Sequence, residues 1–178
     1  MNELEIVNYI EECIGKLGRK FEQNPDYFIS LKEQDLVAYL YHLICLNPIF
    51  LDEIDYVDEN ENNIKTKLIE TQTPTFDKIN KNIGSFDLTI LNPNDNKKED
   101  NLIAMEFKWI GDEVTKRILE IKADIDKINK KVNEVKFGYI LVFKSDSKIS
   151  KKLKDEILGY NKNPSTKIFF FERKEKAD

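Results

Sequence analysis

Apolar residues recur at helical spacing in two segments near the N-terminus. In the first, spacings of three and four residues predict an amphipathic helix that ends before Asn24 and Pro25. Its apolar side consists of Leu4, Val7, Ile10, Ile14, Leu17 and Phe21. The second segment has an apolar side made of Leu36, Val37, Leu40, Tyr41, Leu43 and Ile44. We expect this helix to open at residues 30–33, with Ser30 as its N-cap, and to stop at Asn47 and Pro48.

The middle of the chain changes to strand patterns. Residues 66–70, 86–91 and 102–109 have the length and the apolar content of β-strands. Polar, turn-forming residues fill 92–101, so an antiparallel hairpin is the simplest interpretation of the last two strands. The acidic segment 52–63 is typical of a loop or a short irregular strand.

Helical and strand patterns alternate in the C-terminal half. A narrow apolar stripe predicts a long helix beginning near Glu113; it consists of Val114, Ile118, Ile121, Ile125, Ile128 and Val132. Residues 137–143 are apolar throughout, as in an interior strand covered on both faces. Residues 150–158 predict a helix ended by Gly159, residues 167–172 predict a last strand, and the tail from Arg173 is expected to fray. This order of elements predicts an α/β fold with a mixed central β-sheet flanked by helices.

The whole chain, 1–178, is expected to form a single domain. Its 178 residues can bury about two-thirds of the unfolded surface without disulfides. Its parts are an N-terminal helix (1–24), a core (30–143) and a C-terminal helix and strand (147–172). Cys13 and Cys45 lie among apolar residues without metal-ligand spacing, so we expect reduced core thiols. No apolar run approaches the roughly 20 residues of a membrane span, and the acidic start is unlike a secretory signal. We therefore expect a cytoplasmic protein with no membrane partner.

Charge and motifs narrow the classes of function. A formal net charge of −5 argues against a protein that coats nucleic acid by bulk electrostatics. Lysines nevertheless gather between Lys116 and Lys154, and Lys116 and Arg117 at the start of the long helix are candidates for binding a nucleic-acid phosphate. The alternative for each is a solvated surface. With one histidine, His-based metal sites are excluded, and no phosphate-loop, dinucleotide-binding or serine-hydrolase motif occurs.

Charged residues interrupt the two central strands. Strand alternation puts four residues on one face of the second strand: Leu102, Ala104, Glu106 and Lys108. In an antiparallel hairpin Asp87, at the start of the first strand, lies within reach of Glu106 and Lys108. Two neighbouring carboxylates favour a cation between them, and such oxygen ligands suit Mg²⁺, with Mn²⁺ as a substitute. The Phe107 backbone carbonyl could add a third oxygen. A metal there would activate water against a phosphodiester, while Lys108 orients that water or stabilises the transition state.

The same residues carry a resemblance to a known family. A helical glutamate, an aspartate on one strand and Glu-x-Lys on the next, followed by a helix and a strand, resembles the PD-(D/E)XK nuclease superfamily, which has the restriction-endonuclease-like fold. Glu33, Asp87, Glu106 and Lys108 match this pattern within residues 30–143, although Phe86 replaces the family's proline.

The resemblance implies a Mg²⁺-dependent endonuclease, a hydrolase acting first of all on DNA. Glu33, Asp87, Glu106 and Lys108 would be its catalytic residues. Asp87, Glu106 and the Phe107 carbonyl would hold the metal, with Glu33 acting through water. A homodimer is expected because one active site cuts one strand.

Structural interpretations stay open beside this one. Glu-x-Lys also arises from a cross-strand ion pair, and Asp87 could make a turn hydrogen bond. Glu33 lies three residues after Ser30, the spacing of a capping box, and Asp35 takes its place if the helix register differs. The alternative functions are a catalytically idle nucleic-acid-binding or assembly module on the same fold, and a structural protein whose four residues never meet. RNA as substrate and exonuclease action also stay open.

Overall fold

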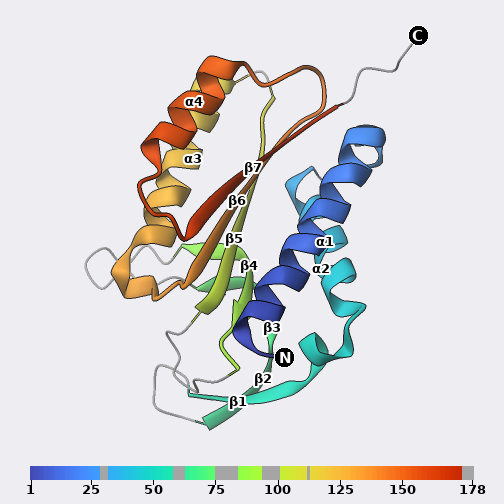
Figure 1. Cartoon of the computed structure of the whole chain (residues 1–178), viewed down its shortest axis with the longest axis vertical. Coiled ribbons are helices and arrows are strands. Elements are labelled where there is room, and N and C mark those ends of the chain that lie inside the picture. Colours follow the sequence, from blue (N-terminus) through green and yellow to red (C-terminus); the bar gives the residue numbers. More distant parts are fainter. Residues whose placement is uncertain (29–31, 58–62, 75–83, 94–100, 112, 174–178) are drawn as a thin grey trace.

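A five-stranded mixed sheet forms the centre of the protein (Figure 1). The structure is a computed structural model of the whole chain and describes residues 1–28, 32–57, 63–74, 84–93, 101–111 and 113–173. The strand order is β3-β4-β5-β6-β7. The strands are β3 (Ile69–Pro74), β4 (Ser85–Leu91), β5 (Asn101–Trp109), β6 (Phe137–Lys144) and β7 (Thr166–Glu172). The β3-β4 and β4-β5 pairs are antiparallel, and β5-β6 and β6-β7 are parallel. The predicted α/β class with a mixed sheet is confirmed.

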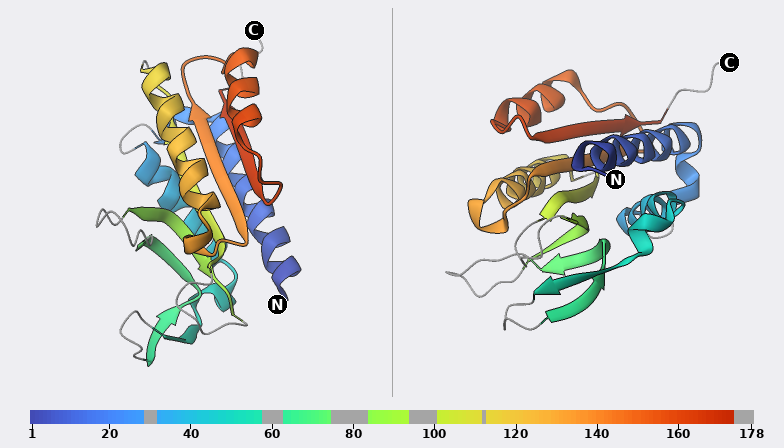
Figure 2. Two further views of the ribbon diagram at one scale, coloured as in Figure 1. Left: turned by 90° about the vertical axis from the view of Figure 1, so that its left-hand side faces the viewer. Right: turned by 60° about the horizontal axis from the view of Figure 1, so that its bottom comes forward.

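Two helices cover each face of this sheet (Figures 1 and 2). On one face α1 (Glu3–Gln23) and α2 (Glu33–Cys45) bury their apolar sides against Met105 and Phe107 of β5. On the other face α3 (Val114–Asn129) and α4 (Lys151–Tyr160) pack on Ala104 and Val142. A capping box between Asn2 and Glu5 opens α1, which ends before Asn24 as predicted.

The start of α2 differs from the prediction. The helix begins at Glu33, and its N-cap is Lys32, which has a φ of 50° and makes no side-chain cap hydrogen bond because a lysine side chain has no acceptor. Glu33 is therefore the first helical residue and not the third, so the capping-box interpretation is wrong. The predicted N-cap Ser30 lies outside the described residues. A 3₁₀ turn (Pro25–Phe28) precedes this helix and another (Pro48–Leu51) follows it.

The prediction of a single strand for residues 66–70 is wrong, because Leu68 interrupts the strand. β2 (Asn63–Lys67) pairs with β1 (Glu53–Val57) in a separate two-stranded sheet, below the central sheet in Figure 1, and β3 starts at Ile69. Leu68 and Ile69 are both buried in the α1-α2 core, which the alternation of one continuous strand does not allow. Of the two expectations for residues 52–63, the short strand is correct for Glu53–Val57, and residues 58–62 lie outside the described residues.

Smaller differences have local causes. Leu102 packs in the α1-α2 core and not on the face of Ala104, because the β4-β5 register shifts between Ile90 and Leu91. Val132 lies in a 3₁₀ turn (Lys131–Asn133) after α3, and α4 continues through Gly159. The interior strand β6 and the last strand β7 are confirmed. None of the helices in the described part of the chain is long and apolar enough to cross a membrane.

Candidate active site

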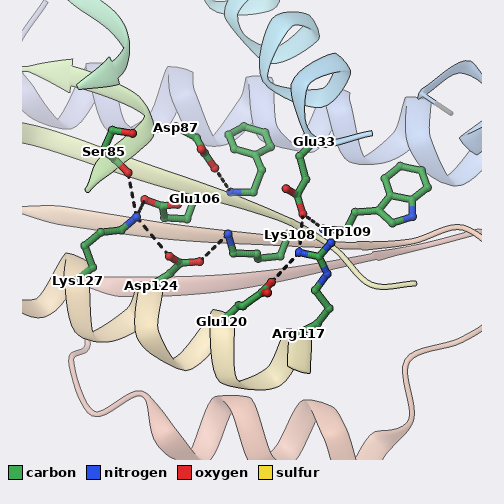
Figure 3. Close-up of polar contacts among 11 residues, drawn as sticks. Glu33, Ser85, Asp87, Glu106, Lys108, Trp109, Arg117, Glu120, Asp124 and Lys127 are labelled. Carbon is green, nitrogen blue, oxygen red and sulfur yellow. Dashed lines mark hydrogen bonds and ion pairs between the residues drawn. The ribbon is translucent and has the colours of Figure 1, made fainter. Parts of the chain in front are cut away.

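The predicted residues meet where the start of α2, the strands β4 and β5, and α3 come together (Figure 3). Glu106 and Lys108 extend from β5 towards α3, where they contact Lys127 and Asp124. Within the part of the chain that the structure describes, neither residue makes the cross-strand ion pair considered from the sequence. Their ion-pair partners come instead from the helix that covers this face of the sheet.

Two carboxylates hold the backbone of β5 beside this cluster. Asp87 Oδ2 accepts a hydrogen bond from the Phe107 N–H at 2.9 Å, and Glu33 Oε1 accepts one from the Trp109 N–H at 2.8 Å. The described pairs between β4 and β5 end at Leu88 and Met105. Phe107 and Trp109 lie beyond that pair, and the two carboxylates accept hydrogen bonds from their N–H groups. Asp87 therefore bonds across to β5 and not within a local turn.

Glu106 is the most deeply buried charged group of the site, with 2% of its surface exposed. Its Oε1 lies 2.5 Å from Lys127 Nζ, so the Lys127 ammonium is the partner of this buried oxygen. Burial, with the negative charges of Asp124 and Asp87, raises the pKa of Glu106 to about 8, and Lys127 opposes this rise.

Lys108 is held as a cation. Its Nζ lies 2.9 Å from Asp124 Oδ2, and its side chain is 16% exposed. Burial alone would lower the pKa of Lys108, but the charges of Asp124, Glu106 and Glu33 outweigh burial and raise it. The same carboxylates that surround the candidate metal site thus keep this lysine protonated.

Two site residues, Asp124 and Lys127, were missed from the sequence. Asp124 Oδ1 lies 3.3 Å from Lys127 Nζ, and Lys127 also donates a hydrogen bond to the Ser85 carbonyl at 3.0 Å. Asp124 follows Ile121 by three residues and precedes Ile128 by four, so it stands within the apolar stripe of α3. A carboxylate inside such a stripe is the sequence feature that could have identified it.

The two predicted phosphate-binding residues have different positions. Arg117 lies at the edge of the site, with Nη1 2.6 Å from Glu120 Oε2 and 3.7 Å from Glu33 Oε1. Lys116 is an exposed residue, with 67% of its side chain accessible and an ion pair to Glu113 at 3.3 Å. The structure thus brings Arg117, but not Lys116, into contact with a candidate catalytic residue.

An open groove of about 900 Å³ leads to the site between α2 and the strands β2, β3 and β4. Glu33 and Asp87 both line it, together with Tyr41 of α2 and Gln72 of β3. Solvent and small ligands therefore have a route to the carboxylates of Glu33 and Asp87.

The donor set is small for a metal site. Among the residues that the structure describes, no three Asp, Glu, His or Cys side chains form a group that could hold a metal ion. Mg²⁺, however, is commonly held by one or two carboxylates, with waters and substrate phosphates as its other ligands. Asp87 and Glu106 would supply two such carboxylates, of which Glu106 is paired with the Lys127 ammonium in this structure.

No protein-family model matches the sequence, and neither a curated protein nor a solved structure shows significant similarity to the chain. Function is therefore inferred from the residues of the site and not from relatives.

Proposed function

We propose that this protein is a Mg²⁺-dependent nuclease that hydrolyses phosphodiester bonds, with DNA as its first expected substrate. The observation that carries the proposal is the hydrogen bond from the Phe107 N–H to Asp87, because Phe107 lies between Glu106 and Lys108 on β5. One or two carboxylates commonly hold Mg²⁺ at a phosphate, where the ion activates water and neutralises developing charge. The mixed sheet between helix pairs is also what a restriction-endonuclease-like fold would provide, as the family resemblance implies.

Asp87, Glu106 and the Phe107 carbonyl would hold the metal, with Glu33 acting through a water. A bound Mg²⁺ supplies positive charge at the phosphate and lowers the pKa of its water. Mn²⁺ would substitute, because both ions prefer oxygen ligands.

The sequence left two roles for Lys108, orienting the attacking water or stabilising the transition state, and the proposed role is the second. Its raised pKa keeps it protonated at neutral pH, so it donates hydrogen bonds and positive charge and does not act as a base. Asp124 fixes the ammonium through its Oδ2. Lys108 would thus stabilise the negative charge that develops on the phosphate oxygens.

Cleavage assays test the proposal. Supercoiled plasmid, single-stranded DNA and RNA are incubated with the protein and Mg²⁺ or Mn²⁺. We expect metal-dependent cleavage that falls at least about 100-fold in Lys108→Ala and in Asp87→Ala. Lys122→Ala is the matched control, because Lys122 also lies on α3 but pairs with Glu156 of α4. Cleavage that survives in Lys108→Ala or Asp87→Ala would contradict the assignment.

The Lys127–Glu106 ion pair favours a second candidate, the catalytically idle nucleic-acid-binding or assembly module. Lys127 already neutralises a carboxylate that a metal would need. Full nucleic-acid binding without metal, together with no calorimetric sign of divalent-metal binding, would support this second function and contradict the first.

A further inference from the structure

The ammonium group of Lys127 lies among oxygen atoms from three elements (Figure 3). Its Nζ is 2.5 Å from Glu106 Oε1 on β5, 3.0 Å from the Ser85 carbonyl on β4 and 3.3 Å from Asp124 Oδ1 on α3. The Phe86 ring lies nearby, with its centroid 5.6 Å from the same nitrogen. Carboxylate and carbonyl oxygens around a positive charge are also what a bound metal ion needs.

The Glu106 oxygen in this set belongs to the proposed metal ligand that is most deeply buried. A carboxylate that is 2% exposed needs a nearby positive charge, and Lys127 provides one. A divalent ion and an ammonium on the same oxygen would repel each other strongly in this buried place.

Lys127 is flexible and partly exposed, although the Ser85 carbonyl also accepts a hydrogen bond from its ammonium. Its side chain is 22% exposed, and lysine carries its charge on a flexible stem. Asp124 bonds Lys127 through Oδ1 and Lys108 through Oδ2, so Lys108 keeps its own partner when Lys127 moves. The two lysines are therefore separable in function, although they share one carboxylate.

We propose that Lys127 is a tethered cation that competes with the divalent metal for the Glu106 carboxylate and thereby sets the metal affinity of the site. This inference rests on the proposed nuclease function. The metal binds only when the Lys127 ammonium has moved off Glu106, so low metal concentrations leave the enzyme self-inhibited. Removing the ammonium strengthens metal binding, whereas removing a residue that stabilises the metal ligands would weaken it.

Calorimetric titration with Mn²⁺ tests the proposal on the wild-type protein, Lys127→Met and Lys122→Met. Lys122 is the matched control, because it lies on the same helix, is 24% exposed and pairs with Glu156 away from the site. The titration is run at pH 8 and at pH 9, because more of the Glu106 carboxylate is ionised at higher pH and Lys127→Met removes a charge that lowers its pKa. We expect the Mn²⁺ Kd to fall about tenfold or more in Lys127→Met and to stay unchanged in Lys122→Met.

Thermal unfolding with and without Mn²⁺ gives a second measurement. Lys127→Met removes the counter-charge of Glu106, so it should lower the Tm without metal and increase the rise in Tm that Mn²⁺ produces. If the methionine variant does not fold, Lys127→Gln replaces it, with the same fall in Kd expected.

The two proposals fail in different ways. Equal or weaker Mn²⁺ binding by the Lys127 variant, beside clear binding by the wild-type protein, overturns the competing role of Lys127 alone. No Mn²⁺ binding by any of the three proteins overturns both this inference and the nuclease proposal.

Discussion

Asp124 connects the two lysines of the site, although it was not a candidate metal ligand. One of its oxygens pairs with Lys108 and the other with Lys127. Its charge also contributes to the raised pKa of Glu106 and of Lys108. A single helical carboxylate therefore affects the protonation of both strand residues.

Asp124→Asn should reduce cleavage by between about 10- and 100-fold, the usual effect of losing a group that orients an active-site residue. Without the Asp124 charge, burial lowers the pKa of Lys108 with less opposition. The alkaline limb of the pH–rate profile should therefore move to lower pH. A purely structural role for Asp124 would reduce activity without moving that limb. Asp126→Asn serves as the control, because Asp126 lies two residues further along α3 and accepts a hydrogen bond from the Tyr160 hydroxyl.

Glu106 should make the protein less stable as pH rises in the absence of metal. An unfolded glutamate loses its proton near pH 4.3, whereas the folded Glu106 has a pKa of about 8. Between these values the folded state binds more protons than the unfolded state, so the free energy of unfolding falls with increasing pH. Glu106→Gln should remove this part of the dependence.

Urea unfolding in EDTA at pH 5, 6, 7 and 8 measures the effect, with fluorescence of Trp109, the single tryptophan, as the probe. The same slope of stability against pH in the wild-type protein and in Glu106→Gln would contradict the assignment of the titration to Glu106.

At the scale of elements, close packing of α1 on the sheet depends on a glycine. A Cβ atom built on Gly18 would clash with the ring of Phe171 on β7, whereas one on Gly15 would meet only Arg19 Nη1 at 3.4 Å. Gly18→Ala should lower the free energy of unfolding by about 1–3 kcal/mol because of overpacking. Gly15→Ala should raise it by about 0.5–1 kcal/mol through helix propensity. Equal effects of the two substitutions in urea unfolding would contradict this packing.

The spacing of apolar residues correctly predicted those helices and strands whose sequence pattern depends only on which side chains are buried. The stripe of α1, the interior strand β6 and the long helix α3 follow directly from repeated apolar positions. The break at Leu68 was missed because two consecutive buried residues look like part of one strand. The start of α2 was misplaced because Ser30 and Glu33 match a capping box, whereas tertiary contact with β5 decides where the Glu33 side chain goes.

Prediction of the candidate site from the sequence was limited in the same way by tertiary contacts. Strand alternation placed Glu106 and Lys108 on one face, and both do contact α3 from that face. The identity of their partners depends on how α3 rotates over β5, which no local pattern in the sequence encodes. Asp124 and Lys127 therefore became visible only with the tertiary structure.

At the scale of the whole molecule, the net charge of −5 disfavours binding of a polyanion over the general surface, because 33 acidic residues outnumber 28 Lys and Arg residues. Binding of nucleic acid should therefore depend weakly on salt and strongly on a few residues near the site.

The expected homodimer, which would place two sites on one duplex, is tested by light scattering of the purified protein; a monomer at all concentrations would contradict it.

Lys116→Ala should weaken DNA binding about equally for all sequences and reduce the slope of log affinity against log salt concentration by about one. Lys16→Ala is the control, because Lys16 is also a surface lysine in an ion pair within its own helix, α1. Fluorescence anisotropy with catalytically inactive Lys108→Ala protein as the background measures both slopes. An unchanged slope in the Lys116 variant would remove this residue from the nucleic-acid interface.

The anomalous difference map of a crystal soaked in Mn²⁺ tests the central claim most directly. The nuclease proposal predicts a peak between the carboxylates of Asp87 and Glu106, with metal–oxygen distances of about 2.1–2.3 Å and the Lys127 ammonium displaced from Glu106. A map without a peak between these carboxylates, with Lys127 still on Glu106, would contradict the proposal.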